Sequence, residues 1–370
     1  MKEFPEVKKR LGFGCMRLPM IGEQVDIEQV KRMMDLFLEK GFNYFDTAHG
    51  YIRGLSELTI RECLTSRYPR DKYILTNKLT DNFFRCEEDI DRVFSDQLKA
   101  CGVDYFDFYL MHAQNRDRFE YFKRRHAYER ALKFKEEGKI KHFGISFHDT
   151  ADILDQILTE YPQIEVVQIQ FNYLDYNDLT VQSRLCYEVC VKHDKRVIVM
   201  EPIKGGNLIK LPEKAMDLVK NSGVSPANLA IRFAATPKNM FMVLSGMSTF
   251  EQMEENVSFM ENFIPLTEEE IAFTQDIAMA IKEEGMINCT SCRYCVEGCP
   301  QHILIPDLFS CYNSKKHLND WTADFYYERV ATVGHGKANA CIKCGKCERT
   351  CPQHLPIRDL LIEVSKEFDK

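Results

Sequence analysis

The sequence contains no apolar run approaching the roughly 18 to 20 residues of a membrane-spanning helix, which excludes a segment that crosses a bilayer. No apolar signal region follows the charged stretch Met1–Arg10, so we expect a cytoplasmic protein. An excess of basic residues is also missing, and the net charge of −7 disfavours general nucleic-acid binding. The ordinary mixture of 45% hydrophobic and 28% charged residues excludes disorder and fibrous repeats.

A G-x-G-x-x-G motif after a strand is also absent, which disfavours an open, doubly wound sheet for dinucleotide binding. Short β-branched or aromatic runs instead alternate with amphipathic stretches such as Ile27–Lys40, Glu87–Ala100 and Ala151–Tyr161. Eight such strand–helix units predict a closed (β/α)8 or TIM barrel, with the open sheet as the alternative. The expected strands are Leu11–Cys15, Phe42–Phe45, Tyr73–Thr76, Phe106–Met111, Lys141–Ile145, Val166–Gln170, Val197–Met200 and Met240–Leu244.

A second unit follows the barrel pattern. Thr267 and Glu270 form a capping box in front of a helical pattern at Ile271–Glu283, and Gly285 ends that pattern. We therefore expect three parts, which are a barrel at 1–265, a connecting helix at 266–285 and a small, mainly helical domain at 286–370.

The 15 cysteines are unevenly distributed, and eight of them lie between Cys289 and Cys351. In a cytosolic chain such clustering indicates metal binding rather than disulfides. Both groups of four follow C-x2-C-x2-C-x3-C with proline next, a spacing in which the fourth cysteine ligates the other cluster. The expected ligand sets are Cys289, Cys292, Cys295 and Cys351 for one cluster, and Cys341, Cys344, Cys347 and Cys299 for the other.

The tail therefore resembles a ferredoxin-type domain with two [4Fe–4S] clusters, and structural zinc, which prefers paired C-x2-C knuckles, is the rival. The 41 residues between Cys299 and Cys341 have a mostly helical pattern. We expect their aromatic residues, Trp321, Tyr326 and Tyr327, to be core around the clusters. Four basic residues lie among the cysteine ligands, namely Arg293, Lys343, Lys346 and Arg349. They either form a solvated surface or compensate the negative charge of the clusters.

Three ionisable residues, Asp46, Lys78 and His112, fall where three successive expected strands end. These strand ends share the rim on which the active sites of β/α barrels lie. Tyr51 follows Asp46 by five residues, within reach of the same rim. Each residue alone has a structural explanation, but their convergence predicts a catalytic site.

The chemistry of this set suits the reduction of a carbonyl group. A phenol has an ordinary pKa near 10, and an ammonium group beside it stabilises the phenolate and lowers that pKa. Asp46 would hold Lys78 in place, and His112 would orient the substrate oxygen. We expect Tyr51 to donate a proton to the carbonyl oxygen and to remove one in the reverse reaction.

The chain resembles the aldo-keto reductase superfamily, in its branch with a C-terminal iron–sulfur domain. The matching segments are Leu11–Pro19, Asp46–Tyr51, Asn77–Lys78, Tyr109–His112, Lys141–Ser146, Gln168–Asn172, Val199–Gly206 and Glu255–Asn256. The resemblance implies a nicotinamide cofactor, NAD(H) or NADP(H), and assigns Asp46, Tyr51, Lys78 and His112 to the catalytic four of the family.

The resemblance also implies cofactor-binding positions. Ser146 and Gln168 match residues that hydrogen-bond the nicotinamide amide, and Phe147 and His148 stand where the family usually has asparagine. Met200 takes the place of a stacking aromatic ring. The pyrophosphate would lie along a stretch whose backbone N–H groups and one cation face it, namely Pro202, Lys204, Gly205, Gly206 and Leu208.

At the adenosine end the resemblance places Gln252, Glu255 and Asn256. The stretch Gly246–Asn256 has no basic residue, and Gln252 stands where the family has arginine. Since a 2′-phosphate favours a bidentate cation, we hypothesise a preference for NAD(H), unless a basic residue from another loop restores the contact.

Three functional hypotheses remain open. In the first, the barrel interconverts a small carbonyl compound and an alcohol, and the clusters exchange electrons with a ferredoxin-like partner. A hydride carries two electrons whereas a cubane cluster takes one, and no flavin site is evident to join the two. In the second, the clusters are structural or oxygen-sensing. In the third, the chain is a weakly catalytic cofactor-binding sensor or an electron-transfer subunit.

Overall fold

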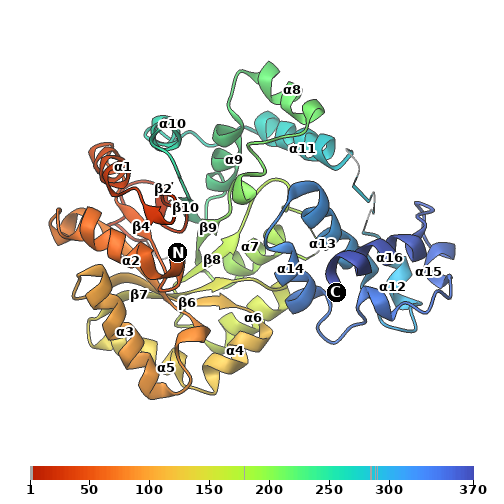
Figure 1. The fold of residues 1–370 in the computed structure, drawn as a ribbon, viewed down its shortest axis with the longest axis horizontal. Coiled ribbons are helices and arrows are strands. Elements are labelled where there is room, and N and C mark those ends of the chain that lie inside the picture. The colour runs from red at the N-terminus through yellow and green to blue at the C-terminus, as the bar shows by residue number, and fades with distance from the viewer. Residues whose placement is uncertain (1–2, 179, 284–285, 288, 290) are drawn as a thin grey trace.

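The computed structural model describes residues 3–178, 180–283, 286–287, 289 and 291–370. Its main feature is a closed barrel of eight parallel strands in the order β1-β10-β9-β8-β7-β6-β5-β4 (Figure 1). The predicted TIM barrel is therefore confirmed. The strands are β1 (Leu11–Gly14), β4 (Tyr44–Asp46), β5 (Ile74–Leu79), β6 (Phe106–Gln114), β7 (Ile140–Phe147), β8 (Val166–Gln170), β9 (Arg196–Met200) and β10 (Met240–Ser245).

Helices surround the barrel on its outer side (Figure 1). They are α1 (Ile27–Glu39), α2 (Leu55–Ile60), α3 (Glu87–Cys101), α4 (Arg116–Lys123), α5 (Ala127–Glu136), α6 (Ala151–Glu160), α7 (Ser183–Lys192), α8 (Glu213–Ser222), α9 (Pro226–Ala235) and α10 (Phe250–Met260). A two-stranded ribbon, β2 (Met20–Ile21) with β3 (Gln24–Val25), follows the first barrel strand.

The barrel has two apolar layers. Its interior is filled by alternate strand residues such as Tyr44, Phe108 and Ile198, and Phe4 packs into the same cluster. A larger cluster lies between the strands and the surrounding helices. Close packing requires glycine at Gly144, because a Cβ atom there would lie 2.4 Å from Val166 Cγ2.

Helix α11 (Glu268–Glu283) leads from the barrel to the tail. The predicted capping box is present, since Glu270 N donates to Thr267 Oγ1 at 3.2 Å and Thr267 N donates to Glu270 Oε2 at 2.9 Å. Ile277 and Ile281 belong to the apolar cluster of the barrel, so this connecting helix packs as part of the barrel. Gly285, expected to end it, lies outside the described residues.

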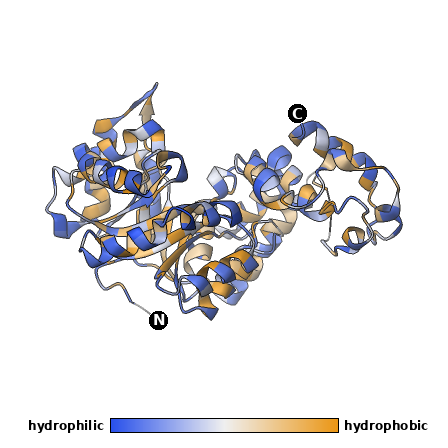
Figure 2. Cartoon of the chain, turned by 90° about the horizontal axis from the view of Figure 1, so that it is seen from below, coloured by the Kyte–Doolittle hydropathy of each residue, from blue (hydrophilic) through white to orange (hydrophobic). Residues whose placement is uncertain are grey.

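The C-terminal module is helical and has its own apolar core. It lies to one side of the barrel (Figures 1 and 2), and Figure 1 shows α13 and α14 as its helices nearest to the barrel. Tyr326 and Tyr327 are buried in this core, as expected, but the side chain of Trp321 is 56% exposed. The helices are α12 (Tyr294–Glu297), α13 (Ile305–Leu318), α14 (Ala323–Tyr326) with the π-helical turn η6 (Tyr327–Ala331), α15 (Lys346–Arg349) and α16 (Ile357–Phe368).

None of the described helices combines the length and the apolar character that crossing a membrane requires.

Candidate active site

Three neighbouring strands carry three of the four predicted catalytic residues at one rim of the barrel. Asp46 ends β4, Lys78 lies in β5 and His112 lies in β6. Tyr51 begins η1 (Tyr51–Gly54), the turn that follows β4. The structure brings all four together, with Lys78 Nζ 4.8 Å from the ring centroid of Tyr51 and the rings of Tyr51 and His112 5.9 Å apart.

Lys78 is a fully buried cation. Its ammonium group donates to Asp46 Oδ1 at 2.5 Å and to the backbone oxygen of Thr47 at 2.8 Å. Burial alone would lower the pKa of Lys78, but Asp46 and Tyr51 outweigh it and hold that pKa above its ordinary value. The second carboxylate oxygen, Asp46 Oδ2, is buried without a hydrogen-bond partner among the described atoms. The site therefore holds a fixed positive charge and one unused acceptor.

The backbone after Tyr51 has an uncommon conformation. Ile52, Arg53 and Gly54 have φ angles of 51°, 54° and 87°. Positive φ is unfavourable for a β-branched residue such as isoleucine, at a cost of about 1–3 kcal/mol that the surrounding structure must offset. This turn directly follows Tyr51, whose half-buried ring lies beside Lys78.

Burial raises the pKa of Tyr51, and the opposing effect of Lys78 does not cancel it. Lys78 lowers this pKa, as the sequence predicts, but the net pKa is raised, because the expectation counted the ammonium charge and not the loss of water. Tyr51 is a protonated phenol at neutral pH, which is the form that a proton donor requires.

His112 is held in its neutral form. Burial lowers its pKa well below the ordinary value, and the positive charges of Lys78 and Arg118 add to that effect. Its Nδ1 lies 2.7 Å from the hydroxyl oxygen of Thr80. The described residues form no hydrogen bond with its other ring nitrogen, Nε2.

Sequence reasoning missed Arg118, which lies in α4 and not at a strand end. Its Nε donates to Asp81 Oδ2 at 2.9 Å and its Nη1 donates to the backbone oxygen of Ala113 at 3.1 Å. The pair with Asp81 places a cation near His112, and that spatial relation has no local sequence signal.

The predicted nicotinamide residues are adjacent. Ser146 on β7 pairs in register with Gln168 on β8, and Met200 ends β9 beside Gln170. The hydroxyl oxygen of Ser146 accepts from the backbone N–H of Ala113 at 2.6 Å. Gln168 Oε1 is buried and has no hydrogen-bond partner among the described atoms. A buried acceptor of this kind fits the N–H of a carboxamide, so these residues suit a nicotinamide ring.

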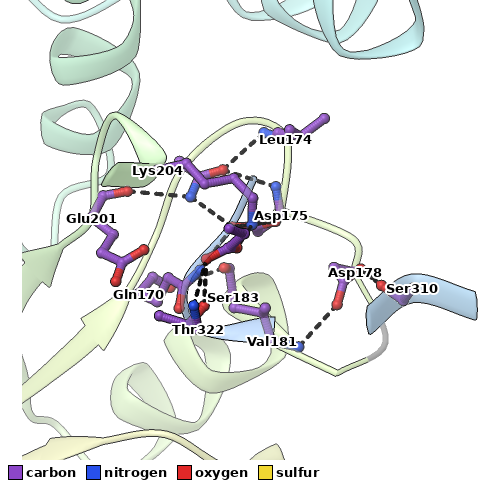
Figure 3. Close-up of polar contacts among 12 residues, drawn as sticks. Gln170, Leu174, Asp175, Asp178, Val181, Ser183, Glu201, Lys204, Ser310 and Thr322 are labelled. Atoms are coloured by element: carbon purple, nitrogen blue, oxygen red, sulfur yellow. Dashed lines mark hydrogen bonds and ion pairs between the residues drawn. The ribbon is translucent and has the colours of Figure 1, made fainter. Parts of the chain in front are cut away.

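The predicted pyrophosphate loop differs from expectation at Lys204, which lies in η5 (Lys204–Gly206). Lys204 Nζ is buried and pairs with Asp175 Oδ1 at 2.8 Å (Figure 3). It also pairs with Asp320 Oδ2 at 2.7 Å. The ammonium group is therefore engaged by carboxylates and is not the free cation that the sequence predicted. The backbone of the loop has positive φ at Lys204, Gly205 and Gly206, with angles of 46°, 65° and 106°.

A different cation, Arg17, lies beside this loop. Arg17 Nη1 donates to the backbone oxygen of Gly205 at 3.3 Å. The Arg17 side chain also lies close to Gly246, because a Cβ atom added to Gly246 would be 3.4 Å from it. In the adenosine stretch, Gln252 Oε1 accepts from the backbone N–H of Ser248. Arg17 thus connects two predicted cofactor segments, and sequence reasoning missed it because it follows β1, far away in the chain.

Two further residues of the adenosine stretch differ in exposure. Glu255 is exposed, whereas Asn256 is buried and its side-chain amide donates to Ser245 Oγ at 3.1 Å. Arg32 from α1 lies 4.6 Å from the ring centroid of Phe250, the first residue of α10. A cation therefore lies near this stretch although the stretch contains none.

The eight clustered cysteines surround two separate pockets. Each pocket encloses space not filled by atoms, about 320 Å³ and 330 Å³, part of it open to solvent. The first is lined by Cys289, Cys292, Cys295 and Cys351, and the second by Cys299, Cys341, Cys344 and Cys347. The structure thus combines three cysteines of one motif with the last cysteine of the other, in the crossed arrangement that the spacing predicts.

The form of these pockets favours clusters over zinc. Among the described residues, no three His, Cys, Asp or Glu side chains converge on a site for a single ion. Four thiols line each pocket without converging on one point, which fits a group larger than one ion, whereas zinc requires tetrahedral convergence. Left-handed residues lie between the ligands of both motifs, for example Ser291 (φ 59°) and Lys343 (φ 57°), so the two halves repeat the same local fold.

Comparison with known proteins identifies both parts of the chain. Residues 10–278 match the sequence model described as "Aldo/keto reductase family". Residues 288–355 match the model described as "4Fe-4S dicluster domain".

Individual relatives align with the barrel part. L-galactose dehydrogenase of Arabidopsis thaliana is 26% identical over 274 residues, which is 67% of this chain and 83% of the relative. NADH-specific methylglyoxal reductase of Escherichia coli is 23% identical over 283 residues, which is 65% of this chain and 85% of the relative. The solved aldo-keto reductase AKR11C1 from Bacillus halodurans superposes with a TM-score of 0.57 at 27% identity and covers 74% of this chain and 97% of its own.

The buried pair of Lys78 and Asp46 yields a stability prediction. Lys78→Met leaves Asp46 buried without its partner, and we expect the unfolding free energy of the barrel to fall by about 3–5 kcal/mol. The double variant Lys78→Met/Asp46→Asn removes the uncompensated charge and should recover most of that loss. Urea unfolding measures both. As a control, Arg92→Met breaks an exposed pair with Asp89 and should change little; an equal loss in Lys78→Met and the control contradicts the prediction.

Proposed function

We propose, from the premise that the chain belongs to the aldo/keto reductase family, that its barrel interconverts a carbonyl compound and an alcohol with NAD(H) or NADP(H). The bound nicotinamide would supply or accept the hydride. The observation that carries the proposal is the convergence of Asp46, Tyr51, Lys78 and His112 at one rim, with the ammonium group of Lys78 4.8 Å from the ring centroid of Tyr51.

In this proposal Tyr51 is the general acid for reduction. Its raised pKa keeps the phenol protonated, so a proton is available when the carbonyl oxygen gains negative charge. Lys78 stabilises the phenolate that forms, and Asp46 keeps Lys78 charged and in position. In the oxidation of an alcohol the same phenolate removes the proton.

His112 is proposed to orient the substrate oxygen. Its low pKa makes it neutral, so it does not compete with Tyr51 as an acid. If the hydroxyl group of Thr80 donates to Nδ1 at 2.7 Å, Nε2 carries the hydrogen and faces the substrate as a neutral donor. This tautomer is part of the proposal.

The proposed cofactor residues follow the predicted set with one change. Ser146 and Gln168 would bind the carboxamide, and Met200 would pack on the ring. The backbone of Pro202–Leu208 would bind the diphosphate with Arg17 as the cation, in place of Lys204. Gln252, Glu255 and Asn256 are proposed to lie at the adenosine end.

The role of Tyr51 is tested by Tyr51→Phe. We expect kcat for carbonyl reduction to fall by about 10²- to 10⁴-fold, the usual size of general acid catalysis, because the ring remains but the proton donor is lost. Cofactor affinity, measured by calorimetry, should stay the same. Tyr161→Phe is a matched control, since its hydroxyl group donates only to the exposed Glu129. Full turnover by Tyr51→Phe would refute this role.

We propose further that the two cysteine pockets hold [4Fe–4S] clusters with crossed ligands. The support is the composition of each pocket and the match of residues 288–355 to a dicluster domain. The corresponding domain bounds are 1–265, 266–285 and 286–370, with the middle helix packed on the barrel.

Paired cysteine variants distinguish crossed from local ligation. If the ligands cross, Cys299→Ala and Cys341→Ala damage the same cluster, and the double variant should keep about four of about eight iron atoms. Cys299→Ala with Cys289→Ala should lose both clusters. Local ligation reverses these two results. Iron analysis and electron paramagnetic resonance measure the outcome, with the buried Cys311→Ala as a control outside both pockets.

The second cluster site has an exposed basic edge, and we propose that an acidic one-electron carrier of the ferredoxin type docks there. Cys344 is exposed and Ile342 is 59% exposed. In the part of the chain that the structure describes, the side chains of Lys343, Lys346 and Arg349 form no ion pair, because the nearby Glu348 pairs with Arg358. The first site differs, since Arg293 there pairs with Asp307.

Charge reversal tests this docking edge. In Lys343→Glu/Lys346→Glu we expect the reduction of the clusters by reduced ferredoxin to slow by about tenfold at low salt, since basic edges steer acidic partners. High salt should remove the difference. Stopped-flow absorbance of the clusters gives the rates, and Lys220→Glu on α8 of the barrel is the control. Equal rates at low salt in all three proteins would exclude this edge as the docking surface.

A further inference from the structure

The stretch between the two cysteine motifs does more than connect them. After α13 the chain passes through Asp320, Trp321 and Thr322 into α14, and side chains of this segment contact the barrel. A shorter link would suffice to join two cluster sites. The contacts fall on the strand ends and the loop to which the proposed function assigns the cofactor.

The first contact is a buried ion triad that crosses from the C-terminal module to the barrel. Lys204 Nζ lies 2.7 Å from Asp320 Oδ2 and 2.8 Å from Asp175 Oδ1, and the three side chains are 1%, 4% and 4% exposed. Asp320 is itself held in place, because its Oδ1 accepts from the backbone N–H of Thr322 at 2.9 Å and from the Thr322 hydroxyl at 2.8 Å.

The triad fixes a loop that needs support. Lys204, Gly205 and Gly206 all have positive φ, and Lys204 is not a glycine. Such a conformation persists only where the surroundings determine it. The loop is fixed through the ammonium group of Lys204, which pairs with two carboxylates, one from the barrel and one from the C-terminal module.

The second contact is Trp321. If Gly205 carried a Cβ atom, the indole Nε1 of Trp321 would lie 3.7 Å from it, and Arg17 Nη2 would lie 3.2 Å from it. An N–H donor and a guanidinium group thus stand beside one peptide of the loop. Since Trp321 is 56% exposed, its ring is not committed to the core of its own module.

The third contact is Tyr326, which is buried in α14. Its hydroxyl group donates to Gln170 Oε1 at 3.0 Å. Gln170 lies on β8, two positions after Gln168, and pairs in register with Met200. The segment therefore reaches both the loop for the diphosphate and the strand ends for the nicotinamide ring.

We propose that Asp320, Trp321 and Tyr326 of the C-terminal module form part of the nicotinamide dinucleotide site. Asp320 is a positioning residue that sets the 204–206 backbone through Lys204. Trp321 offers its indole N–H to the diphosphate. Affinity for the dinucleotide consequently depends on the C-terminal module. This inference rests on the proposed function and adds to it the second wall of the cofactor site.

Because Trp321 is the only tryptophan of the chain, intrinsic fluorescence reports on this one position. The full-length protein with its clusters is titrated with NADH and, separately, with NADPH, without substrate. We expect tryptophan emission to fall, because reduced nicotinamide absorbs where indole emits, and to saturate together with the heat of binding measured by calorimetry.

Two variants test the contacts. Asp320→Asn removes the charge but keeps an oxygen acceptor for Thr322, and we expect the dissociation constant of the dinucleotide to rise by about tenfold, a usual size for coupling between sites. The KM for the dinucleotide should rise in parallel while kcat changes less than about twofold, because the catalytic four are untouched. Trp321→Phe, at an exposed position, should fold normally and bind several-fold more weakly by calorimetry.

The matched control is Asp324→Asn, also in this segment, where the carboxylate pairs only with Lys315 and is 60% exposed. It should bind as the unaltered protein does. Unchanged dinucleotide affinity in both Asp320→Asn and Trp321→Phe, or tryptophan emission that does not respond to a dinucleotide that calorimetry shows to bind, overturns the inference and leaves the proposed function intact. Absence of any dinucleotide binding to the unaltered protein overturns both.

Discussion

A buried ammonium group that must remain charged is the constraint on which the active site depends. Burial of Lys78 favours loss of its proton, and the carboxylate of Asp46 at 2.5 Å prevents that loss. The closed barrel provides this partner, because β4 and β5 are adjacent and both residues lie near one rim. The charge of Lys78 lowers the pKa of Tyr51, but burial raises that pKa by more. The net pKa of Tyr51 therefore lies above its ordinary value. His112, whose pKa burial lowers, lies beside Tyr51.

The same physical arrangement occurs a second time, at Lys204. There too a lysine is buried and pairs with aspartates, but one carboxylate, Asp320, comes from the C-terminal module. Here the structural outcome is different, because the ammonium group faces no phenol and binds two carboxylates. Burial opposes the charge of Lys204, but the two carboxylates hold its pKa above the ordinary value. If the C-terminal module moved away, Lys204 would lose Asp320 and keep only one of its two carboxylate partners. The pair of Lys204 with Asp320 therefore favours the state in which the module is docked on the barrel.

The barrel was predictable because its signals are local. All eight strands appear in or within a few residues of the expected ranges, since period-two and apolar runs report burial directly. The convergence of Asp46, Lys78 and His112 followed from strand order alone. Lys204 was misjudged because its partners, Asp175 and Asp320, lie in other segments, and no local pattern shows that a carboxylate from the tail will occupy a cation. Arg17 was missed for the same reason, and Trp321, which we expected in the core around the clusters, is 56% exposed. The net pKa of Tyr51 was not predictable for another reason. The sequence shows which charges are present, but it does not show how much water folding removes from around them.

A coupling between the two modules does not require electrons to pass between them. A hydride carries two electrons and a cubane cluster accepts one, and the described residues show no group that would divide the pair. A contact such as Lys204 with Asp320 couples the modules by binding energy instead. If the docked module raises affinity for the dinucleotide, linkage requires that the dinucleotide stabilise the docked module by the same factor. Any change at the clusters that loosens the module, such as the loss of a ligand, then lowers cofactor affinity in the barrel. The iron–sulfur module would thus influence a two-electron reaction without taking part in it.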